Sequence, residues 1–392
     1  MNDRKVYLDY AAATPIDPRV REAILTYLDD RFGNPSSFHM PGKEARDAVE
    51  DARFGIAQVL GARADEIIFT SGGTESDNLA ILGFARKNKA AGNHIITTKV
   101  EHEAVLESCR QLEREGFEVT YLDVDELGRV DAQQVVDAIR SETILVSVIY
   151  ANNEIGTVNP IREIGAAIRR ARGERELPVF HVDACQAAGS LEVNTQKLNV
   201  DMLTLNGSKI YGPKGAGLLF CRRGLKLQPL QFGGAQEMGR RPGTENVAGI
   251  VGLAAALKIA EDERAGYIDK LVPLRDKLAN GILSSIDKTR LNGHPTERLA
   301  NNINISFMDV EGEALLLYLD AAGVYASTGS ACTSQSLDPS HVILALGVPF
   351  EVAHGSIRFS LGRNTTEEDI DYVLDKLPPL VGRLRKISSI TV

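Results

Sequence analysis

Three side chains in this sequence have types and settings that could do chemistry. Cys332 lies in the small-residue run Ser327–Ser336, whereas a core cysteine normally lies among aliphatic side chains. This composition is typical of a solvent-facing segment that carries a thiol from one place to another. Asp183 and Lys209 each follow an apolar run closely, where a strand would place them at the edge of a sheet. A thiol, a carboxylate and an amine together indicate a cofactor enzyme whose thiol takes up an atom and passes it on.

Each of the three residues also has a simpler explanation. Lys209 stands near glycines and can form a Schiff base with an aldehyde cofactor, but a solvated surface lysine also fits. Asp183 could hold a pyridinium nitrogen, and it could equally cap a helix that starts at Ala184–Gln186. Cys332 could be an exposed, non-catalytic cysteine. Taken singly, the residues leave these alternatives open.

Two further segments could bind an anion and a flat ring. At Thr70–Ser76 a strand ends, two glycines turn and a helix starts, so free backbone N–H groups there can hold a phosphate. An ordinary strand-to-helix turn explains this segment as well. His102 follows an apolar run and begins a helix, where its ring could stack on a flat cofactor. A lone histidine is more often structural.

The elements that position these residues alternate between strands and helices over residues 65–222. The predicted strands are Ile67–Thr70, His94–Thr98, Glu118–Leu122, Ile144–Tyr150, Val179–Val182, Met202–Leu205 and Gly217–Cys221. The predicted helices are Thr74–Lys89, Glu103–Glu115, Ala132–Arg140 and Ile161–Arg172. Strands alternating with helices predict a mainly parallel sheet that is covered on both faces.

Capping residues predict where several helices begin. Thr74 can cap its helix with Asp77 three residues on, and Asn159 can cap a helix that has Pro160 at its first position. The C-terminal part is predicted to hold a long helical region through about Asn280, followed by strands at Ile303–Phe307 and Ser356–Ser360 and helices at Glu311–Ala321, Pro339–Leu346 and Glu367–Leu384. Thr365 and Glu368 fit a capping box for the last of these helices.

Length and charge narrow the class of protein. The 392 residues exceed what one compact core usually holds, so two domains are expected. We place a large domain at residues 15–258 and a small C-terminal domain at residues 259–392, together with residues 1–14. The net charge of -9 argues against nucleic acid as a partner, because phosphate binding needs a basic face. No cysteine–histidine spacing resembles a zinc site, so no metal is expected.

The cysteine pattern predicts a reduced, cytoplasmic setting. The four cysteines form no C-x-x-C pair, and the sequence shows neither a secretory leader nor an apolar run of about 18 residues that would span a membrane. Cys109 and Cys221 fit buried, inert thiols. Cys185 is ambiguous, because it lies close to Asp183.

Taken together, the motifs resemble a known family. The phosphate turn, a histidine, an aspartate, a lysine and a late arginine occur in an order similar to that of the fold-type I enzymes that use pyridoxal 5′-phosphate. Closer still, several segments resemble the NifS/IscS-type cysteine desulfurases: Leu8–Pro15, Thr70–Asn78, Thr98–His102, Asn152–Gly156, Lys209–Gly215, Arg241–Thr244, Ser330–Ser334 and Ser356–Arg363. The resemblance covers essentially the whole chain. The segment around Cys332 is similar to the NifS/IscS group and not to the SufS group.

The resemblance implies a fold and a cofactor. It implies an α/β fold-type I transferase, in which a large domain has a mainly parallel seven-stranded sheet sandwiched by helices. A smaller α+β C-terminal domain would carry the catalytic cysteine. It also implies pyridoxal 5′-phosphate as cofactor and a homodimer.

The same resemblance assigns roles in cofactor binding. Lys209 would hold pyridoxal phosphate covalently and later move protons. Asp183 would pair with the pyridine nitrogen, and Gln186 would hydrogen-bond the ring hydroxyl. His102 would stack on the ring and serve in acid–base steps. Residues implied at the phosphate are Gly73, Thr74 and, from a second subunit, Thr244.

Two positions depart from the family pattern. Asn206 and Ser208 stand where the family usually has a serine and a histidine that help to bind the phosphate. Both side chains can still donate a hydrogen bond, so we expect phosphate binding to survive. For the substrate, the resemblance implies that Asn153 lies near it and that Arg358 binds its carboxylate.

The implied reaction removes sulfur from L-cysteine. L-alanine is released, and Cys332 carries the sulfur as a persulfide to an acceptor protein for iron–sulfur cluster assembly or tRNA thiolation. The alternatives are a selenocysteine lyase or another fold-type I aminotransferase, and a non-catalytic sulfur-carrier relative. A transaminase would have no use for Cys332, and the presence of Lys209 argues against a non-catalytic relative.

Overall fold

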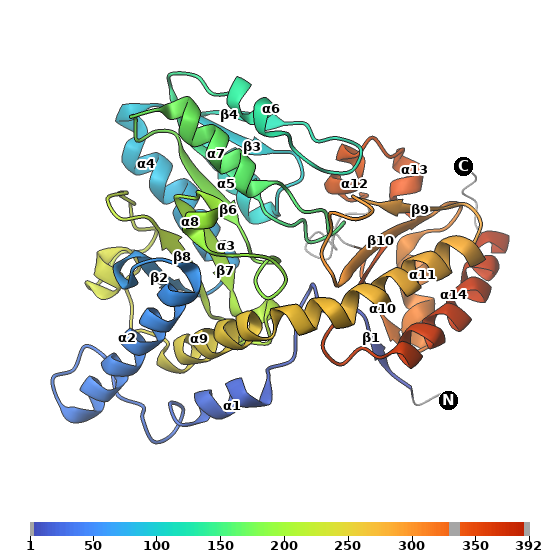
Figure 1. Cartoon of the computed structure of the whole chain (residues 1–392), viewed down its shortest axis with the longest axis horizontal. Helices are drawn as coiled ribbons and strands as arrows, with labels where there is room; N and C mark the ends of the chain where they lie inside the picture. Colours follow the sequence, from blue (N-terminus) through green and yellow to red (C-terminus); the bar gives the residue numbers. More distant parts are fainter. Residues whose placement is uncertain (1–3, 329–337, 388–392) are drawn as a thin grey trace.

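A seven-stranded sheet forms the centre of the molecule. The computed structural model describes residues 4–328 and 338–387 (Figure 1). Its strand order is β2-β8-β7-β6-β5-β3-β4, and only β8 runs antiparallel to its neighbours. The strands are β2 (Ile67–Thr70), β3 (His94–Thr98), β4 (Glu118–Leu122), β5 (Thr143–Ile149), β6 (Val179–Asp183), β7 (Met202–Asn206) and β8 (Gly217–Cys221). The predicted mainly parallel, seven-stranded sheet is confirmed.

Helices cover both faces of this sheet. They include α2 (Met40–Leu60), α4 (Phe84–Asn88), α5 (Glu103–Arg114), α7 (Ile161–Arg172) and α9 (Val247–Asp262). Adjacent residues of β3 point to opposite faces, as a strand requires. Ile95 packs in an apolar cluster with residues of α4 and α5, and Ile96 packs in a second cluster with residues of α2, α7 and α9. Burial on both faces explains why the central strands read as largely apolar runs.

The helix that follows β2 differs from the prediction. α3 (Gly73–Asn78) begins one residue before Thr74, with Gly72 at its N-cap, so the predicted Thr74 cap is wrong. The carbonyl of Gly72 already accepts the first helical hydrogen bond, from Ser76 N at 3.1 Å. A π-helical turn over Leu79–Gly83 then separates α3 from α4, where one continuous helix was predicted.

The predicted cap at Asn159 is also wrong. α7 begins at Ile161, and Pro160 is its N-cap. The Asn159 side chain instead accepts from Val130 N at 3.1 Å and donates to Ile149 O at 2.8 Å. Because this amide joins two distant segments, it is not available to the helix.

The C-terminal part has its own sheet and core. The antiparallel strands β9 (Thr289–Asn292), β10 (Asn302–Phe307) and β12 (Ser356–Ser360) lie in the order β12-β10-β9. Around them are α10 (Arg264–Ser285), α11 (Gly312–Ala321), α12 (His341–Ala345), α13 (Phe350–Ala353) and α14 (Glu367–Ile387). The parallel pair β1 (Val6–Tyr7) and β11 (Val324–Tyr325) brings the N-terminal segment to this core. A domain boundary at residue 258 stays a prediction, and this residue lies inside α9.

Two details of the C-terminal helices differ from the prediction. The predicted helical region through about Asn280 is two helices, α9 and α10, with Glu263 between them. The capping box of α14 lies one residue later than predicted. Thr366 N donates to Asp369 Oδ2 at 3.1 Å and Asp369 N donates to Thr366 Oγ1 at 3.3 Å, whereas Thr365 Oγ1 accepts from Gly362 N.

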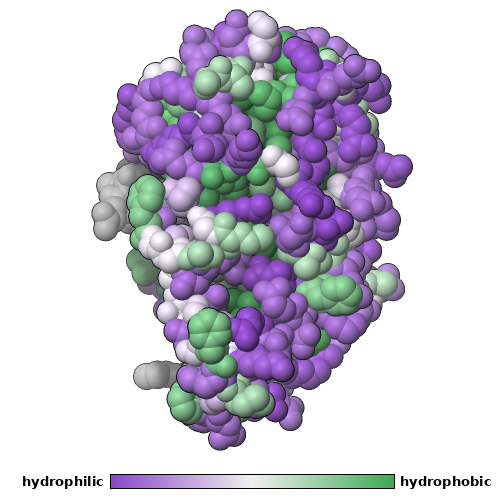
Figure 2. Space-filling view, turned by 90° about the vertical axis from the view of Figure 1, so that its left-hand side faces the viewer, coloured by the Kyte–Doolittle hydropathy of each residue, from purple (hydrophilic) through white to green (hydrophobic). Residues whose placement is uncertain are grey.

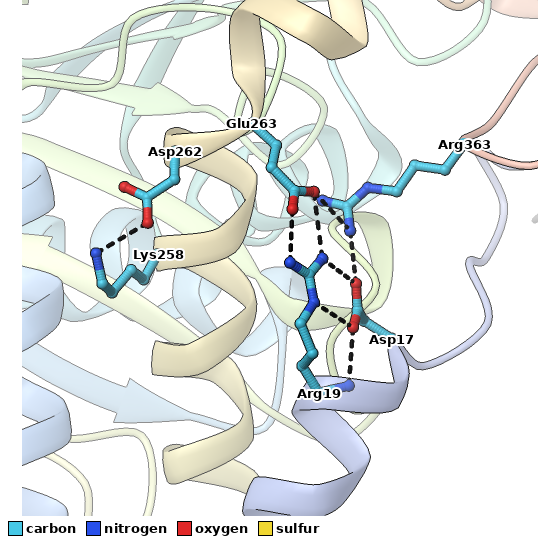
Figure 3. Close-up of polar contacts among 6 residues, drawn as sticks. All are labelled: Asp17, Arg19, Lys258, Asp262, Glu263 and Arg363. Atoms are coloured by element: carbon cyan, nitrogen blue, oxygen red, sulfur yellow. Dashed lines mark hydrogen bonds and ion pairs between the residues drawn. The ribbon is translucent and has the colours of Figure 1, made fainter.

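Ion pairs fasten the N-terminal segment between the two cores. Asp17 caps α1 (Pro18–Leu25) and lies 2.8 Å from Arg19 and 2.7 Å from Arg363, which follows β12 (Figure 3). Arg19 also lies 2.6 Å from Glu263, at the junction of α9 and α10. The hydrogen bond from Arg19 lowers the pKa of Asp17 to about 2, so Asp17 is charged at neutral pH. These ion pairs therefore join the start of α1 to the α9–α10 junction and to the segment after β12.

Candidate active site

A cavity of about 500 Å³ opens at the carboxyl ends of three parallel strands. Ile149, Asp183 and Asn206 end β5, β6 and β7, and all three line it. Open parallel sheets bind ligands at this edge. The predicted site residues that line the cavity are Gly73, Thr74, His102, Asn153, Asp183, Gln186, Asn206, Ser208, Lys209 and Arg358. Cys332 lies outside the described residues.

Lys209 follows β7 in a short helical turn, Gly207–Lys209, and its amine is held by the N-terminal segment. Nζ donates to Ala11 O at 2.8 Å and to Ala12 O at 2.6 Å. Two main-chain carbonyls therefore orient the amine at the cavity wall. This setting excludes the alternative of a solvated surface lysine.

Asp183 lies at the end of β6 and is 5 % exposed. Its Oδ1 accepts from Cys185 N at 2.9 Å. Turns rather than a helix follow it over residues 185–190, so the helix-cap alternative is wrong. The carboxylate instead occupies the cavity floor, where it can face a cationic ring nitrogen.

Three buried ionisable side chains near Asp183 have pKa values shifted toward their uncharged forms. Burial, with the charge of Asp183 as a second cause, raises the pKa of Asp77 well above its usual range. Burial likewise raises the pKa of Glu101 to about 8 and lowers the pKa of His181 to about 3. The His181 ring lies 2.9 Å from Ser147 Oγ and 3.0 Å from Thr204 Oγ1. Each of these shifts favours the uncharged form and so reduces charge repulsion around Asp183.

The turn between β2 and α3 forms a cradle that only glycine permits. A Cβ on Gly73 would lie 2.7 Å from Cys185 Sγ and 3.2 Å from Asn206 Nδ2. Ser208 Oγ donates to Asn206 Oδ1 at 3.0 Å, which turns the Asn206 NH₂ group away from that bond. The Thr74 hydroxyl, the Asn206 amide and the first N–H groups of α3 thus form a donor set that suits a phosphate.

His102 and Gln186 are held by backbone groups. His102 is the N-cap of α5, and its Nδ1 accepts from Ala104 N at 3.1 Å. In the neutral ring the proton is therefore on Nε2. Gln186 Nε2 donates to Ala11 O at 3.0 Å, and Lys209 Nζ donates to the same oxygen.

Arg358 lies on β12 and reaches the cavity from the C-terminal part of the chain. It is 3 % exposed and is therefore buried. Nη2 lies 2.8 Å from Asp9 Oδ1, and Nη1 donates to Asn153 O at 3.1 Å. Among the described residues, Nε has no hydrogen-bond partner. A buried guanidinium with an unused N–H beside a cavity is suited to a carboxylate.

Thr244 does not line the same cavity. It lines an adjacent one of about 220 Å³. Ser71, Gly215 and Ala216 line both cavities, so they separate Thr244 from the cradle. The predicted role of Thr244 at the phosphate of a second subunit stays a prediction.

Sequence reasoning missed the contribution of the N-terminal segment and of Asp77. Main-chain carbonyls such as those of Ala11 and Ala12 carry no side-chain signature. The only signal was the resemblance of Leu8–Pro15 to the family motif. Asp77 was interpreted as a helix-capping residue, although it lines the cavity.

Comparison with known proteins agrees with this geometry. Residues 6–373 match the family described as aminotransferase class V. The chain belongs to this family. Its members use pyridoxal 5′-phosphate, and the amine, the carboxylate and the phosphate cradle of this cavity fit that cofactor.

The chain is also similar over its length to proteins with more specific names. It is 52 % identical to the cysteine desulfurase IscS of Methanosarcina thermophila, over 99 % of this chain and 95 % of that protein. A solved NifS-like protein superposes with a TM-score of 0.90 at 36 % identity, over 97 % of this chain and 100 % of the other. The solved structure of SspA in complex with cysteine gives a TM-score of 0.79 at 36 % identity, over 91 % and 99 %.

Proposed function

We infer that this chain is a pyridoxal-phosphate-dependent cysteine desulfurase. It removes sulfur from L-cysteine, releases L-alanine and carries the sulfur as a persulfide on Cys332. The observation that carries this function is one cavity that brings Lys209, Asp183 and Arg358 together. The chain that contains this cavity is 52 % identical to a cysteine desulfurase over 99 % of its length.

Cofactor binding uses the groups at the strand ends. When bound, pyridoxal phosphate supplies an electron sink for the substrate carbon. Lys209 Nζ would hold it covalently, and the buried carboxylate of Asp183 would keep its ring nitrogen protonated. Gln186 and His102 hold the ring hydroxyl and one ring face. The phosphate would accept hydrogen bonds from the backbone of Gly73 and from Thr74 and Asn206. Ser208 would act through Asn206, because its hydroxyl donates to Asn206 Oδ1 and orients the amide.

Substrate binding and proton transfer use groups on the other side of the cavity. Arg358 holds the carboxylate of L-cysteine, and Asn153 lies beside it. Lys209 Nζ, once uncharged, takes the proton from the substrate Cα. His102 can donate its Nε2 proton in the neutral form, and it can accept one at Nδ1 only by releasing Ala104 N.

Sulfur transfer needs a thiolate, which we assign to Cys332. The thiolate attacks the substrate sulfur, a sulfur–sulfur bond forms, and the carbon–sulfur bond breaks. The electron pair of the broken carbon–sulfur bond passes to the substrate carbon. This carbon takes up a proton and leaves as the methyl group of L-alanine. The described cysteines are unsuited to this step because burial raises the pKa of each thiol, that of Cys221 to about 12.

Product analysis tests this function. With L-cysteine and a reductant, we expect the purified protein to release L-alanine and sulfide in equal amounts. Without the reductant, peptide mass analysis should find one additional sulfur atom on Cys332. An oxo acid without sulfide would indicate a transaminase and contradict the proposal. The same assay with selenocysteine measures the preference for sulfur over selenium.

A homodimer is the proposed assembly. Large apolar side chains are exposed in α1, in α2, in the segment between them and at residues 232–238: Leu25, Leu28, Phe32, Phe38, Met40, Phe54, Phe232 and Met238. Figure 2 views the side of the molecule on which α2 lies, where hydrophobic side chains interrupt the hydrophilic surface. Exposed apolar surface of this extent favours an interface. The position of Thr244 outside its own cradle supports a role at the phosphate of the partner subunit.

Sedimentation tests the dimer. The unaltered protein should sediment at twice the chain mass, and Phe38→Asp combined with Phe54→Asp should shift it to one chain mass, because charges cannot be buried unpaired in an interface. Leu317→Asp, at an equally exposed apolar position on α11, should leave the mass unchanged. A monomeric parent protein would contradict the proposal.

The acceptor and the cellular location are less specific proposals. A protein acceptor for iron–sulfur cluster assembly or tRNA thiolation is proposed from the resemblance to the NifS/IscS-type cysteine desulfurases. The cytoplasmic location stays a prediction from the cysteine pattern. Within residues 4–328 and 338–387, no helix is long and apolar enough to cross a membrane.

A further inference from the structure

Asp9 is a charged residue beside the cavity to which the proposed function gives no role. Its Oδ1 lies 2.8 Å from Arg358 Nη2. Asp9 does not line the cavity, whereas Arg358 does. The Asp9 carboxylate therefore contacts the guanidinium outside the cavity lining. The Asp9 side chain is 21 % exposed, and that of Arg358 is 3 % exposed.

The backbone around this ion pair is fixed on both sides. Asp9 forms a β-bridge with Ser360, and Ala11 N donates to Ser360 Oγ at 2.9 Å. Arg358 pairs with Asn304 in the sheet and exchanges two main-chain hydrogen bonds with Ser327. Because neither backbone is free to shift, the Asp9 carboxylate determines where Nη2 lies.

Two contacts define the plane of the Arg358 side chain. Asp9 accepts from Nη2, and the carbonyl of Asn153 accepts from Nη1. A guanidinium is planar and carries five N–H groups, so these contacts use two and leave others for a ligand. Nε is buried and, in the described part of the chain, has no hydrogen-bond partner. The contacts with Asp9 and Asn153 thus hold the Arg358 guanidinium in one orientation and leave other N–H groups unused by them.

We propose that Asp9 is a positioning residue that aims Arg358 at the carboxylate of the amino-acid substrate and so sets the preference for amino acids over simple amines. This inference rests on the proposed function. Asp9 also neutralises the guanidinium when no substrate is bound, which a buried cation requires. The segment that carries Asp9 also supplies the Ala11 and Ala12 carbonyls to Lys209. One segment thus sets the distance between the amine and the carboxylate sites.

Two small ligands separate this role from general stability. L-alanine and ethylamine differ only by the carboxylate, and binding of each to the holoenzyme can be followed by the cofactor absorbance. In Asp9→Ala we expect the dissociation constant of L-alanine to rise about tenfold. Without Asp9, the Arg358 guanidinium is no longer aligned with the ligand carboxylate, and their charge-assisted hydrogen bond weakens. That of ethylamine should change less than about twofold, because ethylamine makes no contact with Arg358.

A conservative variant and a matched ion pair serve as controls. Asp9→Asn keeps an oxygen acceptor for Nη2 without the charge, so the constant for L-alanine should rise only about threefold. Asp17→Ala removes another Asp–Arg pair between the N-terminal segment and the residues after β12, and it should affect both ligands alike (Figure 3). In an Arg358→Ala background, adding Asp9→Ala should have no further effect on L-alanine binding.

Each outcome decides the matter. Selective weakening of L-alanine binding, restored in part by Asp9→Asn, supports the proposal. Equal weakening of both ligands, or no change in either, overturns it. If Asp9→Ala does not retain cofactor, the Asp9→Asn comparison decides alone. Failure of the unaltered protein to form L-alanine from L-cysteine would overturn the proposed function, whereas this binding comparison requires no turnover.

Discussion

Lys209→Ala is expected to reduce L-alanine release from L-cysteine by at least about 10⁴-fold, the upper range of general acid–base catalysis alone. Lys209 has two roles in the proposed function, because its amine binds the cofactor and also moves the Cα proton. A methyl group can do neither. The measurement is L-alanine and sulfide release at saturating L-cysteine and added cofactor.

Lys214→Ala is the matched comparison. Its amine also lines the cavity and also donates to the N-terminal segment, to Thr14 O at 3.0 Å. Its loss should cost at most about tenfold in turnover, because it removes one hydrogen bond. If Lys209→Ala kept more than about one per cent of the activity, the assignment of the reactive amine would be wrong.

One N-terminal segment contacts both the reactive amine and the guanidinium that binds the substrate carboxylate. Residues 9–14 give carbonyls to Lys209 on one side and a carboxylate to Arg358 on the other. Thr14 accepts from Tyr211 N, and Asp17 pairs with Arg363, so this stretch is fastened at its end. The relative position of amine and guanidinium is therefore set by the N-terminal segment and not by the sheet alone.

The sheet and its strand-end residues could be predicted from the sequence for a physical reason. Strands β5 and β6 are buried along their whole length, so each reads as a mostly apolar run. Asp183 interrupts that pattern at its end, which marks it as a residue at the ligand edge. Gly73 was recognisable because a close approach needs a residue without Cβ.

Other features depend on partners that are distant in the sequence. Asn159 has the type of an N-cap, yet its amide bonds Val130 and Ile149. The carbonyls that hold Lys209 belong to alanines, whose side chains say nothing of that contact. Asp9 lies 349 positions from Arg358, so only the folded chain shows the pair. Local patterns predict elements, whereas these contacts are tertiary.

Cys332→Ser is expected to abolish sulfur transfer while binding of cofactor and substrate survives. A serine hydroxyl does not ionise near neutral pH and cannot form a persulfide, so L-alanine release should fall by at least about 10³-fold. Lys209, Asp183 and Arg358 are unchanged in this variant. The cofactor absorbance should therefore still shift when L-cysteine is added, and the shift should persist because the reaction does not proceed.

The other cysteines make this variant informative. Cys221→Ser is the matched control and should keep full activity. Burial raises the pKa of that thiol to about 12, and Cys221 ends β8 as part of a buried apolar cluster. Among the described cysteines only Cys185 lines the cavity, and burial raises its pKa well above the usual range. If Cys332→Ser still formed L-alanine with additional sulfur on Cys185, the acceptor thiol would be misassigned. If it formed L-alanine with no additional sulfur on any cysteine, sulfur would leave without a protein persulfide, and the central step of the proposed reaction would be wrong.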